Sequence, residues 1–259
     1  MEIRQPAVAG MFYPESPQDL SNTVKNLLAI DDPVNMAPKV LIVPHAGYIY
    51  SGSVAAKAYH LLEPLKDKIQ RVIMFGPSHR VPFTGLALPA TEAFNTPLGM
   101  VSIDTQAIEE AAQLVDVQVL DIAHTHEHCL EVQLPFLQTV LAQFKLVPFV
   151  VGHASAESVA DVIEHFWGGP ETLIVISSDL SHYHPYQEAK AIDAATTEKI
   201  KHLDYHLHGE EACGCKPING ILLTAKRKGL EVTILDTRNS GDTAGPKDTV
   251  VGYGAYALR

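Results

Sequence analysis

Residues 39–45 read KVLIVPH, an uninterrupted apolar run that ends in a proline and a histidine. Two further stretches follow the same plan, RVIMFGPSH at 71–79 and LIVISSDLSH at 173–182. Short apolar runs bounded by turn-forming residues are typical of strands buried on both faces, as in a parallel sheet. The carboxyl ends of parallel strands share one edge, where open α/β folds place their ligand sites. We therefore expect His45, His79 and His182 to converge at that edge.

The segments between these runs predict helices. Ser16 and Pro17 suit the N-cap and first position of a helix that ends near Leu28. Further helices are expected at about 51–62, 105–114, 156–166, 186–203 and 217–228, and further strands at about 145–152, 231–236 and 249–258. Strands and helices alternate through most of the chain. This pattern predicts an α/β fold, a single three-layer domain of residues 1–259 with a largely parallel central sheet.

Charge and cysteine content exclude several classes of protein. The chain carries 19 Lys and Arg against 30 Asp and Glu, a formal net charge of -11, which argues against nucleic acid as a partner. The start lacks a signal-peptide pattern, and apolar runs are too short to span a membrane, so we expect a cytoplasmic protein without a membrane partner. Three cysteines are too few for a disulfide framework. Cys213 and Cys215 are expected to be reduced thiols, with a structural zinc site as the alternative.

His45 and His79 are the first candidates for metal ligands. Each follows a strand after a proline-containing bend, which would direct its imidazole into the crevice. Neutral imidazole is the commonest metal ligand in proteins. The alternative is that each imidazole ties its own loop to backbone carbonyls.

His182 is the candidate acid/base residue. Asp179 precedes it by three residues, so a turn would bring the carboxylate near an imidazole and hold its tautomer. Alternatively, Asp179 caps the turn that follows. His184 is the weaker candidate of the two neighbouring histidines.

Two other histidine groups have no assigned chemistry. His124, His126 and His128 alternate beside Glu127, but their spacing alone does not define a site. Near them the sequence has no zincin motif, no nucleophile elbow and no phosphate-binding glycine loop. These absences disfavour a protease or a nucleotide hydrolase. His202, His206 and His208 follow a polar helix and are expected to be solvated, with a surface metal site as the alternative.

Several motifs together resemble the Memo family, whose prokaryotic members are often called AmmeMemoRadiSam system protein B. The resemblance runs from Ile3 to Leu258. The matching stretches are AGMFYP at 9–14, PHAGYIYSG at 44–52, GPSH at 76–79, EHCLEVQLPFL at 127–137, SSDLSHY at 177–183, CG at 213–214 before PI at 217–218, NSGDT at 239–243 and VVGYGA at 250–255. The family in turn resembles the class III extradiol, or LigB-like, dioxygenases, which implies that fold and a non-haem iron site.

Carried over by position, the resemblance implies that His45 and His79 bind the metal, that His182 with Asp179 beside it is the acid/base residue, and that Phe12 lines the pocket. The third ligand is a carboxylate in the dioxygenases and a cysteine in animal Memo proteins. Here Thr243 falls at the cysteine position. Asp242 beside it would complete a two-histidine, one-carboxylate triad, with Thr243 or water as the alternatives. A divalent metal is expected, Fe(II) first, with zinc or copper as alternatives.

Two functional classes follow from these residues. In the first, the protein is an oxidoreductase that uses a metal and dioxygen to oxidise a small molecule, with His182 exchanging a proton. In the second, the pocket binds a metal, a peptide or an anion without turnover. A metal-dependent hydrolase is a third route. The family's naming also implies a functional link to a radical SAM enzyme and an Amme-type protein.

Overall fold

Parallel strands form the centre of the main sheet in the computed structural model, which describes residues 2–31 and 34–259. In sheet order they are β2 (Val40–Val43), β9 (Thr172–Ser177), β3 (Arg71–Pro77) and β8 (Lys145–Val151). All four run in the same direction, and apart from the first residues of β3 and β8 every position in them is buried. Burial on both faces explains why their sequences are continuously apolar. The α/β class and the parallel centre predicted from the sequence are confirmed.

Antiparallel strands extend this centre on both sides. At one end β12 (Val250–Leu258) pairs with β2 and also with β11 (Val232–Asn239) and β10 (His182–His184). At the other end β4 (Leu86–Leu88) runs antiparallel to β8, and β7 (Val117–Val119) pairs parallel to β4. Within the described residues the main sheet therefore has nine strands and is mixed. A second sheet has three strands, β1 (Ile3–Arg4), β5 (Ala93–Thr96) and β6 (Gly99–Ser102).

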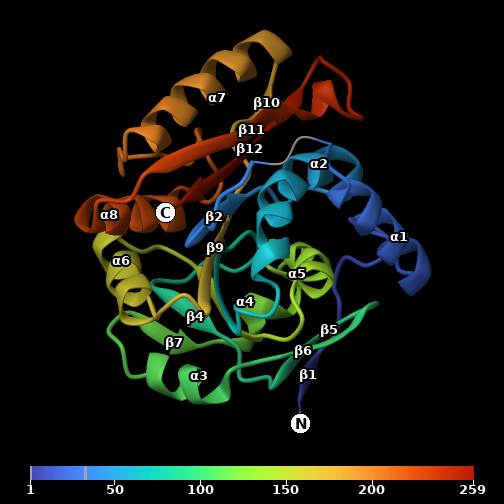
Figure 1. The fold of residues 1–259 in the computed structure, drawn as a ribbon. Coiled ribbons are helices and arrows are strands. Elements are labelled where there is room, and N and C mark those ends of the chain that lie inside the picture. Colours follow the sequence, from blue (N-terminus) through green and yellow to red (C-terminus); the bar gives the residue numbers. More distant parts are fainter. Residues whose placement is uncertain (1, 32–33) are drawn as a thin grey trace.

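Helices cover both faces of the main sheet and make it the middle of three layers (Figure 1). One face packs on α1 (Pro17–Leu28), α2 (Tyr48–Tyr59) and α5 (Leu134–Val140), and the other on α3 (Thr105–Ala111), α6 (Ala156–His165) and α8 (Cys215–Lys228). Alternation along β2 serves both cores, because Leu41 and Val43 face the first group while Val40 and Ile42 face the second. The three-layer arrangement is as predicted.

Shorter elements complete the fold. The helix α7 (Tyr186–Lys201) lies against β11 and β12, and α4 (Asp121–Thr125) lies against β4. Three 3₁₀ turns are η1 (His60–Leu65), η2 (Glu131–Gln133) and η3 (Ser240–Asp242). No helix in the described ranges is long and apolar enough to cross a membrane.

Local signals explain where the helices begin. The Ser16 side chain accepts a hydrogen bond from the Asp19 amide and Pro17 occupies the first turn of α1, as the sequence indicates. Pro135 lies in the first turn of α5, where its missing N–H costs nothing. The helix expected over 105–114 ends at Ala111 instead.

Candidate metal centre

His45 and His79 meet His128 at the carboxyl edge of the parallel strands. His45 follows β2 by two residues, and His79 follows β3 by two. His128 comes from the loop between α4 and η2. One ligand atom from each imidazole lies within 4.8 Å of the other two, so these three residues could hold a metal ion. The ring centroids are 4.6 Å apart for His79 and His128, and 5.1 Å and 5.3 Å from His45 to His79 and His128.

Glu127 supports two of these histidines. Its carboxylate accepts hydrogen bonds from the His79 amide at 2.7 Å and from His79 Nδ1 at 2.9 Å, and it lies 3.2 Å from His128 Nδ1. Burial raises the pKa of this carboxyl, but the hydrogen bonds and charge of His79 outweigh burial and lower the pKa to about 2. The ionised carboxylate can only accept, so His79 carries its proton on Nδ1 and presents the Nε2 lone pair.

Burial keeps the other two imidazoles neutral, the form that binds metal. It lowers the pKa of His45 well below the ordinary value, and the neighbouring His79 lowers it further. It lowers the pKa of His128 to about 4, with His45 and His79 acting in the same direction. Phe12 packs on His128 with ring centroids 4.9 Å apart, so it lies beside this group as the resemblance implies.

Asp179 supports His45 rather than His182. Its Oδ1 accepts a hydrogen bond from the His45 amide at 2.7 Å, and its Oδ2 lies 4.0 Å from His45 Nε2. His182 is oriented by a backbone carbonyl instead, since its Nδ1 lies 2.9 Å from the Leu180 oxygen. The tautomer-fixing bond expected between Asp179 and His182 is therefore replaced by one within the turn. Burial raises the pKa of Asp179, and the nearby charge of His182 opposes that rise. The same charge adds to the burial that lowers the pKa of His45.

Cys213 lies beside His45. Its Sγ lies 3.3 Å from His45 Nε2 and 3.7 Å from the Asp179 carbonyl oxygen. Burial raises the pKa of this thiol, so in the metal-free protein the sulfur keeps its proton. Cys215 begins α8, and no group of metal donors among the described residues includes it.

Asp242 has a local role in η3. One carboxylate oxygen accepts from the Asn239 amide at 3.0 Å as part of a capping box with Asn239, and the other accepts from the Tyr186 hydroxyl. Thr243 donates its hydroxyl to the Ser240 carbonyl at 3.2 Å. The donor groups found within the described ranges contain neither residue. The structure thus brings His128, and not Asp242, into one group with His45 and His79.

His124, His202 and His206 make their hydrogen bonds outside the three-histidine group. His124 is buried and bonds through Nε2 to the Ala87 carbonyl at 2.9 Å. His202 and His206 are exposed and bond within their own segments, at 2.8 Å to the Glu198 carbonyl and 2.9 Å to Asp204.

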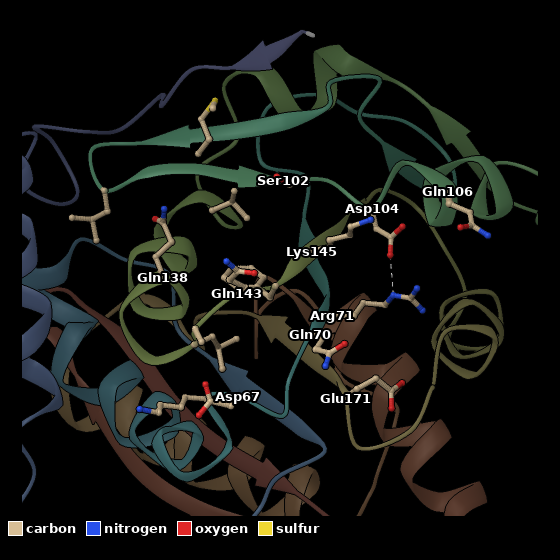
Figure 2. A pocket seen from close by; sticks show the side chains of 17 residues that line it. Asp67, Gln70, Arg71, Ser102, Asp104, Gln106, Gln138, Gln143, Lys145 and Glu171 are labelled. Atoms are coloured by element: carbon tan, nitrogen blue, oxygen red, sulfur yellow. Dashed lines mark hydrogen bonds and ion pairs between the residues drawn. The ribbon is translucent and has the colours of Figure 1, made fainter.

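A broad cleft of about 1220 Å³ lies away from this centre (Figure 2). It is lined by Arg71 and Lys145, the first residues of β3 and β8, and thus lies at the opposite end of those strands from the histidines. Arg71 is paired with Asp104 at 3.0 Å on its wall. The lining residues, all from the described part of the chain, include neither histidine nor cysteine.

Fold and site together define a three-layer α/β protein with a three-histidine centre at the carboxyl edge of its parallel strands. The chain belongs to the Memo family, because the family described as Memo-like protein matches residues 4–257.

Relatives with the same family description match over almost their whole length. A MEMO1 family protein of Aquifex aeolicus is 37% identical and covers 98% of both chains. One from Methanosarcina mazei is 35% identical over 100% of both, and one from Saccharolobus solfataricus is 38% identical over 96% of this chain and 97% of the relative. A solved structure, uncharacterized protein JW3007 from Escherichia coli K12, superposes with a TM-score of 0.47 at 11% identity, covering 83% of this chain and 98% of that one.

Proposed function

We propose that this protein binds a divalent transition-metal ion through His45, His79 and His128, and that the bound ion serves the oxidation of a small molecule. The observation that supports the proposal is the approach of three imidazole donors to within 4.8 Å of one another. Imidazole ligands suit iron, zinc and copper. Three protein ligands leave positions open for substrate, which is the arrangement of catalytic rather than structural sites.

The supporting groups also fit a metal. Ligating histidines almost always have their second ring nitrogen held by an acceptor, and here Ser177 holds His45 while Glu127 holds His79. In the proposal His128 takes the place that the resemblance gave to Asp242, because both carboxylate oxygens of Asp242 are already engaged in η3. Bound ferrous ion would supply Lewis acidity and electrons toward dioxygen. Zinc or copper at the same donors is the alternative.

His182 is the proposed proton-transfer group. The Leu180 carbonyl can only accept, so Nδ1 of His182 donates to it and Nε2 keeps a lone pair. An imidazole of this kind can remove a proton from a substrate hydroxyl and return it later. Phe12 packs against His128 with the two rings tilted at 53°.

Metal content after anaerobic purification tests the binding step. We expect about one ferrous or comparable ion per chain, and His45→Ala, His79→Ala and His128→Ala should each weaken binding at least roughly tenfold. Asp242→Ala is the matched control and should keep wild-type affinity. Loss of metal from the Asp242 variant with full retention by the His128 variant would contradict the assigned ligands.

Oxygen consumption tests the chemistry. The iron-loaded protein is mixed with a panel of catechols and then with cell extract, and uptake of dioxygen is recorded. His182→Ala should keep its metal and lose roughly 100- to 10,000-fold in turnover. Tight metal binding without uptake for any substrate would favour the non-catalytic binding role.

A further inference from the structure

The hydroxyl of Ser177, at the end of β9, has three hydrogen-bond partners. Its oxygen lies 2.6 Å from the Cys129 carbonyl oxygen, 2.9 Å from Gln133 Nε2 and 2.9 Å from His45 Nδ1. A hydroxyl has one hydrogen to donate and two lone pairs. Because a carbonyl oxygen only accepts, the hydrogen of Ser177 goes to Cys129. The two lone pairs of the Ser177 oxygen are then left to accept hydrogen bonds from Gln133 and His45.

Gln133 cannot reverse its side-chain amide to change this assignment. The group facing the Pro44 carbonyl at 3.0 Å must be the NH₂ nitrogen, since two oxygens would repel. The Tyr59 hydroxyl donates to the amide oxygen at 2.8 Å on the other side. Gln133 therefore presents an N–H to Ser177 and fills one of its two acceptor positions. This leaves one acceptor position for His45.

We infer that Ser177, supported by Gln133 and Tyr59, is a positioning residue that holds His45 as the tautomer protonated at Nδ1, so that the Nε2 lone pair faces the centre. A serine alone would not fix this choice, because a hydroxyl can also donate to an imidazole and leave the proton on Nε2. That tautomer would block the ligand nitrogen. The chain of hydrogen bonds from Tyr59 through Gln133 to Ser177, called the relay below, removes this choice. The serine hydrogen is donated to the Cys129 carbonyl, so Ser177 can only accept from His45.

Burial supports this assignment of the His45 tautomer, because water does not reach the hydrogen-bonding groups. His45 is 2% exposed, Gln133 1%, and Ser177 and Tyr59 0%, so solvent does not compete for their hydrogen bonds. The group on the far side of His45 agrees with the assignment, since the Cys213 sulfur at 3.3 Å from Nε2 can donate its hydrogen to that lone pair. The relay is neutral throughout, whereas His79 is oriented by the carboxylate of Glu127.

Nitrogen NMR of metal-free protein labelled with ¹⁵N-histidine tests the inference, since the two ring nitrogens report the tautomer directly. His45 is assigned from the signal missing in His45→Gln. Wild type should show His45 protonated on Nδ1, and Ser177→Ala should shift the tautomer ratio by about three- to tenfold toward Nε2. Ser177→Cys keeps the shape with a weaker acceptor and should shift it in the same direction, which provides the test if the alanine variant folds poorly.

Ser181→Ala is the matched control, because its hydroxyl is also buried but has no hydrogen-bond partner among the described residues. It should leave the His45 signal unchanged. A wild-type His45 protonated on Nε2, or a ratio that neither Ser177 variant alters, would overturn the inference.

The consequence for metal rests on the proposed function. Ser177→Ala should weaken binding of ferrous or zinc ion about 10- to 100-fold, while Ser181→Ala should not. Failure of the wild type to bind any metal would refute the proposed function and leave the tautomer result standing. Wild-type metal affinity in Ser177→Ala together with a shifted tautomer would overturn the role of the relay in preparing the ligand.

Discussion

Glu127 is a single residue that contacts two of the three histidines proposed as metal ligands. Its carboxylate accepts from the His79 amide and imidazole, and also from the amides of His128 and Cys129 at 2.9 Å and 3.2 Å. In Glu127→Gln the NH₂ group would face at least one of these donors. We expect metal affinity to fall about 10- to 100-fold and the free energy of unfolding to fall by about 1–3 kcal/mol. Calorimetric titration and urea unfolding measure the two effects.

Glu188→Gln is the control for that change. Glu188 is an exposed carboxylate that also lies 2.9 Å from a histidine nitrogen, His184 Nδ1, but neither residue belongs to a metal-donor group among the described residues. Glu188→Gln should change neither the metal affinity nor the free energy of unfolding appreciably. Equal metal affinity in Glu127→Gln and wild type would show that the carboxylate does not orient the ligands.

Residues differ in how far the sequence could place them. His45 and His79 could be placed together at the sheet edge because each follows a buried strand, and strand ends can be located from the apolar pattern alone. His128 and Glu127 lie in a loop whose path has no periodicity, so their spacing predicts no direction for the side chains. The stretch 127–137 was nevertheless part of the family resemblance, and that is the signal that could have identified them. Asp242 was chosen for its chemistry, but η3 uses both of its oxygens.

At the scale of elements, Gly214 lets the start of α8 press against the end of β9. A Cβ at this position would lie 2.6 Å from Ser178 Cβ and 2.9 Å from the Ser177 carbonyl oxygen. Its neighbours are Cys213, beside His45, and the strand end that carries the relay serine. In Gly214→Ala these two segments must separate. We expect a loss of about 1–3 kcal/mol in stability and roughly tenfold weaker metal binding.

Gly220→Ala is the control that distinguishes a general loss of packing from an effect on metal binding. A Cβ on Gly220 would lie 2.3 Å from Val159 Cγ1, where α8 packs on α6. This variant should lose a similar amount of stability by overpacking yet keep wild-type metal affinity, both measured as for Gly214→Ala. Equal effects of the two variants on metal binding would mean that the position of the α8 start has no influence on the centre.

Elements were predicted well where they are long. The parallel strands and helices such as α1 have enough residues to show apolar runs or helical spacing, so the sequence pattern identifies them. The strands β1, β7 and β10 have two or three residues, too few for any period to appear. Their pairing depends on partners far along the chain, as when β10 pairs with β12.

At the scale of the whole molecule, the N-terminal segment is fastened to the part of the chain that carries His128 and Gln133. Arg4 pairs with the fully buried Glu131 at 2.8 Å and donates to the carbonyls of Glu127 and His124 at 2.6 Å and 2.7 Å. Glu131 also accepts from the Tyr13 hydroxyl at 2.6 Å. Buried polar contacts therefore join the N-terminal segment to the stretch of chain that carries His128 and Gln133.

Acid should unfold the protein in part through His124 in this region. Burial lowers the pKa of His124 to about 4, although its hydrogen bond to the Ala87 carbonyl opposes the change. Between the ordinary value near 6.5 and about 4, the unfolded chain binds a proton there that the folded protein does not. Stability is thus full above pH 6.5 and falls as the pH drops toward 4. The contribution of this one group is on the order of 3 kcal/mol.

His124→Gln tests this with an uncharged residue that can keep the bond to Ala87. His124 Nδ1 has no hydrogen-bond partner among the described residues, so the change removes no second bond. Urea unfolding of metal-free protein at pH 7 and pH 4.5 measures the loss of stability on acidification. Wild type should lose more than the variant by about 2–3 kcal/mol, because His45 and His128, whose pKa values burial also lowers, contribute equally to both proteins. An identical loss in both would show that His124 takes up its proton without unfolding the molecule.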